Sequence, residues 1–171
     1  MVNATVETFG AIDPAAQYVL RPGGYLVIVD SEGRIATVHT SSGVYLPGGG
    51  QELGETPQQA AVREAREECG LGVAVERWLG VADELVHDVA EGLHYRKRCE
   101  FFLARVRGES SGREPGHRLV WLSRHEAASC LSHGSQQWAL SCAATLTGVY
   151  YAERDEQPFQ LTGQPHRIFF A

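Results

Sequence analysis

Short apolar runs, separated by polar or glycine-containing turns, recur along most of the chain and predict a series of β-strands. Residues 25–30 (YLVIVD) have the pattern of a buried strand, and residues 34–40 (RIATVHT) that of its hairpin partner. Residues 1–22 are weakly patterned and predict only a short strand and a leading loop. Further strands are expected at residues 73–79, 81–86, 94–107 and 118–122, with Gly80 separating the first two of these.

A helical pattern begins after residue 56. Thr56 suits the N-cap, Pro57 suits the first helical position, and Gln59 completes a capping box with Thr56. Gly70 suits the left-handed conformation that ends a helix, so the sequence predicts a helix over residues 57–69. At about 100° per residue, one arc of this helix should pack on a sheet and another should face solvent. The packing arc comprises Ala61, Val62, Ala65 and Cys69, and the solvated side comprises Gln59, Arg63 and Arg66.

The same helix carries three acids on a third face. Glu64, Glu67 and Glu68 lie at spacings i, i+3 and i+4. Like charges at this spacing destabilise a helix by roughly 0.2–0.5 kcal/mol, and acids in the last turn oppose the helix dipole at about 0.3–1 kcal/mol each. A divalent cation removes these costs, and Mg2+ or Mn2+ best suits carboxylates that also face phosphate. The alternative is a solvated charged face in which Arg63 pairs with Glu67.

A glycine-rich segment at residues 47–50 (PGGG) precedes this helix. Consecutive glycines allow the backbone to approach a metal or a phosphate closely, although a plain flexible loop has the same composition. Gly49, Glu55 and residues 63–71 (REAREECGL) match the fixed polar and glycine positions of the Nudix box, so the chain resembles the Nudix hydrolase family. Ala65 departs from the larger aliphatic residue usual in the family, which concerns packing more than chemistry.

The resemblance implies an α/β fold, namely a Nudix-type α/β/α sandwich with a mixed sheet. The order of the expected strands and helices agrees with such a sheet between helical layers. The resemblance also implies a metal site that holds Mg2+ or Mn2+ through the backbone carbonyl of Gly48 and the carboxylates of Glu64, Glu67 and Glu68. Glu64 and Glu68 are expected to be catalytic, with Glu64 helping to deprotonate the attacking water.

Three further residues have expected supporting parts in this site. Glu55 would support the loop or coordinate a second ion through water, and Arg63 would orient the acids by ion pairing. Nudix enzymes often supply an additional acid from the segment before the last strand, as a metal ligand or general base. Glu114 is the nearest candidate for this additional acid, and His117 stands closer to the strand.

The implied activity is that of a metal-dependent pyrophosphohydrolase. Such an enzyme cleaves a phosphoanhydride bond in a nucleoside diphosphate linked to another moiety, as in nucleoside di- and triphosphates, nucleotide sugars or ADP-ribose. Nucleoside di- and triphosphates are preferred by default, because the sequence has no marker for ADP-ribose. Two alternatives remain: a diphosphate isomerase on the same fold, which would use a catalytic cysteine, and a non-catalytic nucleotide-sensing module.

Composition places the chain among ordinary globular proteins. Of its 171 residues, 43% are hydrophobic and 21% are charged, which predicts one domain at residues 1–150 and a docked or flexible C-terminal tail at residues 151–171. The net charge of −6 argues against DNA or membrane binding, so the expected partner is a small nucleotide. The four cysteines lack C-x-x-C spacing and no signal peptide is seen, which favours free thiols in the cytoplasm. The tail could also contribute to a homodimer.

Several polar and aromatic side chains are candidates with open roles. Residues 95–98 (YRKR) could contact a phosphate or a base, or could form an exposed strand edge. Glu84 and Asp88 could reach a substrate. Ser123 opens a short helix to about residue 131, and a further helix is expected at residues 133–147. In that helix, Trp138, Cys142 and Leu146 form a stripe typical of core packing.

Overall fold

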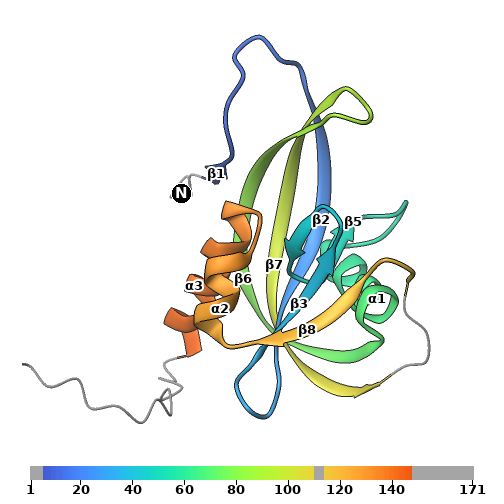
Figure 1. The fold of residues 1–171 in the computed structure, drawn as a ribbon, viewed down its shortest axis with the longest axis vertical. Coiled ribbons are helices and arrows are strands. Elements are labelled where there is room, and N and C mark those ends of the chain that lie inside the picture. Colours follow the sequence, from blue (N-terminus) through green and yellow to red (C-terminus); the bar gives the residue numbers. More distant parts are fainter. Residues whose placement is uncertain (1–5, 110–113, 148–171) are drawn as a thin grey trace, which may run out of the picture.

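A computed structural model describes residues 6–109 and 114–147 of the chain. This part contains one mixed sheet of eight strands and three helices (Figure 1). The strands are β1 (Glu7–Phe9), β2 (Tyr18–Val29), β3 (Ile35–Thr40), β4 (Gly43–Tyr45), β5 (Gly48–Gly50), β6 (Leu71–Asp88), β7 (Leu93–Glu109) and β8 (Arg118–Leu122). The helices are α1 (Pro57–Cys69), α2 (Arg124–Cys130) and α3 (Gly134–Thr147).

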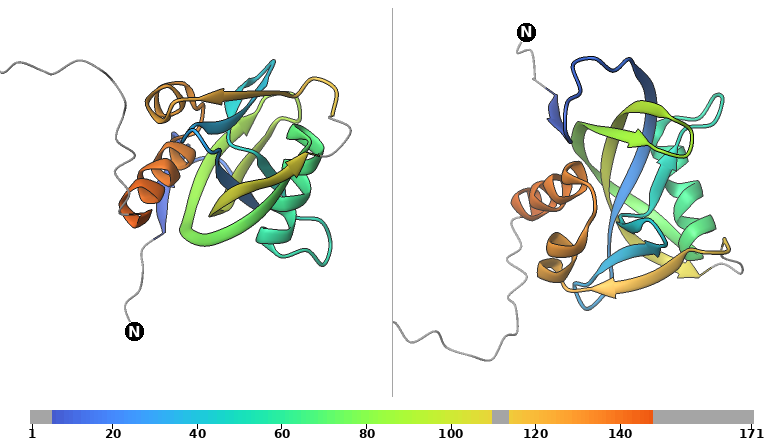
Figure 2. Two further views of the ribbon diagram at one scale, coloured as in Figure 1. Left: turned by 90° about the horizontal axis from the view of Figure 1, so that it is seen from below. Right: turned by 45° about the horizontal axis from the view of Figure 1, so that its top comes forward.

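The strands run in the order β1-β6-β7-β2-β3-β4, while β5 pairs with β2 and β8 pairs with β3. Parallel pairing joins β2 to β7 and β1 to β6, and the other pairs are antiparallel. Helix α1 covers one face of the sheet, whereas α2 and α3 cover the other (Figure 1 and Figure 2). The expected α/β/α sandwich with a mixed sheet is therefore confirmed.

Alternate residues of β2 serve the two faces of the sheet, as the period of a strand requires. Leu26 and Ile28 lie in the core beneath α1, and Val27 and Val29 lie in the core beneath α2 and α3. All four side chains are buried. The continuous apolar run in the sequence is explained by this double burial, because each face needs its own set of apolar side chains.

Helix α1 has the predicted bounds and caps. Thr56 and Gln59 form the capping box, and Gly70 ends the helix in a left-handed conformation. The apolar arc is rotated slightly from its expected position, because Ala60 is fully buried and Val62 is only half-buried. The assignment of Arg63 to the solvated side is wrong, since its guanidinium lies over the helix among the carboxylates.

Strand β2 begins seven residues before the predicted start at residue 25. The glycine segment forms the short strand β5, so the alternative of a plain flexible loop is wrong. Gly23 and Gly24 allow β2 to pair with β5 and to pack against α1. A Cβ atom at Gly24 would lie 1.8 Å from the carbonyl oxygen of Pro57, and one at Gly23 would lie 2.4 Å from that of Gly49. These two glycines thus let β5 and α1 pack directly against β2.

Strand β6 is continuous, so the prediction of two strands separated at Gly80 is wrong. Register shifts occur on both sides of residues 73–78, and Gly80 sits beside the last one. A Cβ atom at Gly80 would lie 2.6 Å from the indole of Trp138, so the glycine makes room for this ring. Trp138 packs against the core, as its stripe predicted, and meets Phe101 edge to face.

Strand β7 lies between β6 and β2, so the alternative of an exposed strand edge for residues 95–98 is wrong. All four cysteines are free thiols, as expected. Within residues 6–109 and 114–147, no helix is long and apolar enough to cross a membrane. The predicted tail at residues 151–171 and the side chain of Leu146 lie outside the described residues.

Candidate active site

A cavity of about 690 Å³ opens between the glycine strand β5, the N-terminal halves of β2 and β7, the end of β6, and the loop that leads into β8. The segments that line it come from distant parts of the sequence, including the start of α3. Glu68 is the acid of helix α1 that lines this cavity, and His117 lies beside it. The acidic helix therefore meets an open space through its last turn.

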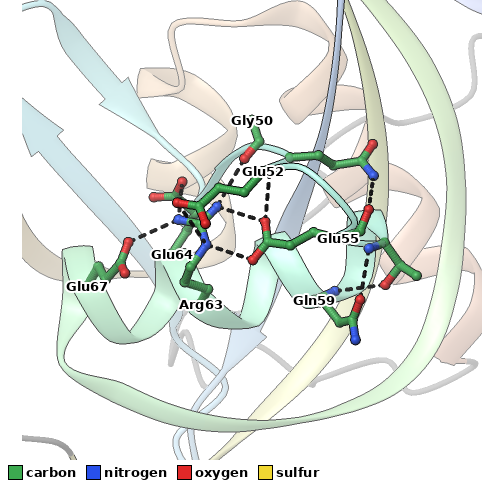
Figure 3. A network of polar contacts seen from close by, with 9 residues as sticks. Gly50, Glu52, Glu55, Gln59, Arg63, Glu64 and Glu67 are labelled. Atoms are coloured by element: carbon green, nitrogen blue, oxygen red, sulfur yellow. Dashed lines mark hydrogen bonds and ion pairs between the residues drawn. The ribbon is translucent and has the colours of Figure 1, made fainter.

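Arg63 is the centre of an ion-pair network on the outer side of this helix (Figure 3). Its Nε and Nη2 atoms donate to the two carboxylate oxygens of Glu55, at 2.8 and 3.0 Å. Its Nη1 atom donates to Glu64 Oε1 at 2.9 Å and to Glu67 Oε2 at 3.0 Å, and Nη2 also donates to the carbonyl oxygen of Gly50 at 3.1 Å. The hydrogen bonds from Arg63 lower the pKa of Glu55. One cation thus ties the loop before the helix, β5 and two of the acids together.

Glu68 stands apart from this network. Its Oε2 atom accepts a hydrogen bond from the backbone N–H of Gly48 at 3.1 Å. Its side chain is 13% exposed, and Nε2 of His117 lies 3.5 Å from Oε1. Burial raises the pKa of Glu68 to about 8; the Gly48 hydrogen bond opposes this rise, and the negative charges of Glu64 and Glu114 add to it. Within residues 6–109 and 114–147, no arginine or lysine pairs with this carboxylate as Arg63 pairs with Glu55.

Glu64 lies between the network and the glycine strand. Burial raises its pKa, and the hydrogen bond from Arg63 opposes that rise. A Cβ atom at Gly49 would lie 2.5 Å from Glu64 Oε1, so a glycine is needed for the carboxylate to approach the backbone of β5 this closely. Glycine and carboxylate therefore form one unit, although they are 15 residues apart in the sequence.

The loop before β8 approaches the acidic helix through two residues. The backbone N–H of Glu114 donates to the carbonyl oxygen of Glu67 at 2.8 Å. The Glu114 carboxylate is 55% exposed and lies 3.5 Å from Nδ1 of His117. Because Nε2 of the same ring faces Glu68, His117 stands between two carboxylates. His117 lines the cavity, whereas Glu114 is not among its lining residues.

The strand alternation separates the candidates at residues 95–98. Arg96 and Arg98 point to the face of the sheet opposite the cavity, where both donate to the buried carboxylate of Asp83. Tyr95 and Lys97 occupy the other face, and Lys97 lines the cavity. Of the two further acids, Asp88 lines the cavity, while Glu84 is buried and accepts from the backbone N–H of Ser135 at 2.8 Å.

Several cavity residues were not among the sequence candidates. Tyr25 was assigned only to a buried strand, and Arg21 fell in the weakly patterned N-terminal segment. Tyr45 meets His133 edge to face at 5.0 Å, and Gln136 accepts from the backbone N–H of Leu46 at 2.9 Å. The charge of Arg21 was the one available signal, but the late predicted start of β2 placed it outside the sheet.

The NUDIX domain model matches residues 19–142, which is most of the chain. The chain belongs to the Nudix family. The match spans β2 to α3 and includes both the acidic helix and the glycine strand.

Individual relatives agree with the Nudix assignment. Over 38 residues the chain is 50% identical to an 8-oxo-dGTP diphosphatase of Escherichia coli (strain K12), a match that covers 22% of this chain and 30% of that relative. A Nudix hydrolase structure from Nitrosomonas europaea superposes with a TM-score of 0.62 at 19% identity, covering 74% of this chain and 90% of that one. A MutT Nudix hydrolase structure from Burkholderia pseudomallei gives a TM-score of 0.52 at 30% identity, covering 72% and 97%.

Nudix hydrolases generally use divalent metal ions, which are bound by clustered oxygen donors. In the described residues, no three His, Cys, Asp or Glu side chains are arranged as they would be around a metal ion. Arg63 explains this, because it draws Glu64 and Glu67 to one side while Glu68 faces the cavity. The donor chemistry nevertheless fits a hard cation, since carboxylates outnumber the arginine and lie beside glycines that admit close approach.

Proposed function

We propose that this chain is a divalent-metal-dependent pyrophosphohydrolase that cleaves a phosphoanhydride bond of a nucleotide. Nucleoside triphosphates are the proposed preferred class, and the local match to an 8-oxo-dGTP diphosphatase supports this choice. Mg2+ or Mn2+ is the proposed cofactor, held by Glu64, Glu67, Glu68 and the backbone carbonyl of Gly48. The free thiols suit a reducing compartment, and we place the protein in the cytoplasm.

The observation that carries this proposal is the unbalanced charge beside the cavity. Three carboxylates, those of Glu55, Glu64 and Glu67, share the guanidinium of Arg63. Among the described residues, Glu68 accepts a backbone hydrogen bond from Gly48 and has the ring of His117 at 3.5 Å, but no arginine or lysine pairs with it. A half-buried carboxylate without a cation is costly in the native state. A surplus of hard oxygen donors at the wall of an open cavity is suited to a bound cation and an anionic substrate.

Each residue has a proposed part in hydrolysis. A bound divalent cation supplies charge that offsets the diphosphate and lowers the pKa of the attacking water. Glu64, Glu67 and Glu68 would hold it together with the carbonyl of Gly48. Glu64 would also accept the proton of the water, a task that suits a carboxyl whose pKa is raised by burial. Arg63 orients the acids and Glu55 anchors Arg63 to the loop. The oxygen of water bonds to phosphorus while the bridging P–O bond breaks, which yields two phosphorylated fragments without a covalent enzyme intermediate.

The diphosphate isomerase alternative requires a reactive cysteine. Cys99 is 3% exposed, and burial raises its pKa to about 12. Cys69 is fully buried in the core beneath α1. A thiol with a pKa raised in this way is a weak nucleophile, and the fully buried Cys69 is not accessible to a substrate, so both cysteines favour the hydrolase.

A nucleotide panel with Mg2+, analysed by mass spectrometry, tests the proposal. Hydrolysis gives a nucleoside monophosphate and a second phosphorylated fragment, whose masses add up to the mass of the substrate plus one water. An isomerase would return a product of unchanged mass, and a sensing module would bind a nucleotide without converting it. Absence of turnover across nucleoside di- and triphosphates, nucleotide sugars and ADP-ribose would reject the hydrolase.

A further inference from the structure

Two cations meet at one end of the cavity, away from the acidic helix. Arg21 on β2 and Lys97 on β7 are paired in register on neighbouring parallel strands, and both line the cavity. Register partners in a sheet project to the same face, with their backbones about 4.8 Å apart. The two positive charges are therefore held side by side by the backbone of the sheet, independently of any loop.

These two cations differ from the other basic residues around the site. Arg63, Arg96 and Arg98 are each ion-paired with carboxylates. Within the described residues neither Arg21 nor Lys97 forms an ion pair. Burial lowers the pKa of Lys97, Arg21 contributes to this, and the carboxylates of Glu84 and Asp88 oppose it from beyond ion-pair distance. Two neighbouring cations without counter-ions repel each other, and an anion between them would relieve that repulsion.

The side chain of Arg21 is also held in position. Its guanidinium carbon lies 5.3 Å from the ring centroid of Tyr95, which is a cation–π contact, and the Tyr95 hydroxyl donates to the Glu91 carboxylate. Its Nε atom lies 3.6 Å from the point where a Cβ atom at Gly50 would stand. Tyr95 is therefore a positioning residue, and Arg21 reaches toward the glycine strand.

The Arg21 guanidinium and the Glu68 carboxylate lie near two different residues of β5. Arg21 Nε lies near Gly50, whereas Glu68 accepts a hydrogen bond from the N–H of Gly48. These two glycines are two residues apart along β5, which pairs with β2. At about 3.3 Å per residue this offset is about 7 Å, a separation that a short polyphosphate chain can span. One end of such a chain would meet the acidic helix, and the other would meet the cation pair.

We propose that Arg21 and Lys97 form a phosphate-binding subsite that takes the phosphoryl group farthest from the acidic helix, and so selects nucleoside triphosphates over nucleotides whose diphosphate is linked to an uncharged group. This inference rests on the proposed hydrolase for its substrate, but the anion site itself stands on the register pair and its missing counter-ions. A bidentate guanidinium beside an ammonium is a common arrangement for phosphate recognition.

Binding of inorganic tripolyphosphate, measured by calorimetry without divalent metal, tests the anion site apart from catalysis. Arg21→Gln and Lys97→Gln should each weaken binding by about tenfold, the effect of losing one charged hydrogen bond. Lys97→Arg, which keeps the positive charge, should bind tripolyphosphate about as well as the wild-type protein. Arg107→Gln is the matched control, because Arg107 is an exposed cation of the same strand that does not line the cavity. Equal binding by wild type, Arg21→Gln and Lys97→Gln would overturn the proposal.

Kinetics with Mg2+ then test the choice of substrate. With dGTP, Arg21→Gln and Lys97→Gln should raise KM by about tenfold with little change in kcat, whereas kcat/KM for ADP-ribose should stay near wild type. Equal losses on both substrates would overturn the selection for triphosphates. If tripolyphosphate binding depends on both residues but no nucleotide is hydrolysed, the hydrolase fails and the anion site stands. Melting temperatures of all variants exclude loss of folding as the cause.

Discussion

Two ion-pair clusters in this fold combine arginines with carboxylates, but one has an excess of carboxylates and the other an excess of arginines. Around Arg63, one guanidinium meets the carboxylates of Glu55, Glu64 and Glu67. Around Asp83, one carboxylate meets the guanidinium groups of Arg96 and Arg98. The first cluster lies beside the cavity with Glu68 next to it, whereas Asp83, Arg96 and Arg98 are not among the residues that line the cavity. The ratio of carboxylates to guanidinium groups and the position relative to the cavity, more than the number of ion pairs, distinguish a candidate active site from a structural cluster.

The two buried carboxylates show the physical consequence. Burial alone would raise the pKa of Asp83, but the hydrogen bonds from Arg98 and Arg96 outweigh burial and lower it. Burial raises the pKa of Glu68 to about 8, because one backbone hydrogen bond does not compensate for burial and for neighbouring acids. The charge of Asp83 is thus satisfied within the protein. Among the described residues no arginine or lysine pairs with Glu68, so a bound cation would stabilise its charge further, which is the property expected of a metal ligand.

The sharpest way to break this contrast is Glu68→Gln. We expect hydrolysis to fall by about 10²–10³-fold or more, since the main proposed ligand loses its charge while its shape is kept. The melting temperature without metal should stay equal or rise, because an ill-compensated carboxylate is removed. Turnover of a nucleoside triphosphate with Mg2+ and a thermal melt measure both quantities.

Glu32→Gln is the matched control for this variant. Glu32 is an exposed acid of the turn between β2 and β3, away from the cavity, so its loss should leave turnover unchanged. Near wild-type hydrolysis by Glu68→Gln would remove the distinction between the two clusters and, with it, the metal assignment.

Addition of Mg2+ or Mn2+ should stabilise the protein by binding at the acidic residues beside Arg63. The ion-pair cluster around Asp83 should contribute nothing to this stabilisation. A ligand that binds only the native state stabilises it by about 2.7 kcal/mol at 100 times its Kd. The melting temperature should therefore rise with metal concentration in wild type and Asp83→Asn alike, but hardly in Glu68→Gln. KCl at matched ionic strength is the control, and a flat titration of the wild-type protein would count against the site.

The local sequence predicts much of the acidic cluster around Arg63, but nothing of the cluster around Asp83. The caps and periodicity of α1 fixed its bounds, and the acids at positions 64, 67 and 68 identified its charged face. The direction of Arg63 was mispredicted, because a long side chain can curl from its own helix face onto a loop and a strand. The second cluster was invisible, since Asp83 and Arg98 are joined only by the pairing of β6 and β7.

Only one half of the cation pair in the cavity was anticipated from the sequence: Lys97 was a candidate phosphate contact, whereas Arg21 was missed for a similar reason. Arg21 lies in a segment whose proline and glycines resemble a turn, and only the parallel pairing with β7 makes it part of the sheet. Parallel pairing depends on residues far apart in the sequence, so local patterns do not predict it. The sequence therefore predicts which residues share one helix or strand. Which residues lie side by side on neighbouring strands becomes known only from the three-dimensional structure.

Gly49→Ala tests whether geometry as well as charge distinguishes the acidic cluster. The added methyl would stand 2.5 Å from Glu64 Oε1, so the carboxylate has to move. Because it is the end of a flexible side chain, the melting temperature should change little, while kcat should fall by about tenfold through the misplaced group. Gly108→Ala is the control, since nothing lies within 4 Å of the added atom. Unchanged turnover in Gly49→Ala would mean that the position of Glu64 does not matter.

The smallest effect should come from Asp83→Asn, which alters stability and not activity. Loss of the buried charge leaves two half-exposed arginines unpaired, and solvent limits the cost to about 1–2 kcal/mol. A lowered pKa means that Asp83 stabilises the native state above its unfolded value of 3.8 and ceases to do so as pH falls through the folded value. Urea unfolding of both proteins should therefore differ at pH 7, begin to converge only below about pH 3.8, and coincide once the pH is under the folded pKa, while turnover at pH 7 stays equal. A difference that persists at low pH would show that Asp83 acts through its shape, and a loss of turnover would join the two clusters into one site.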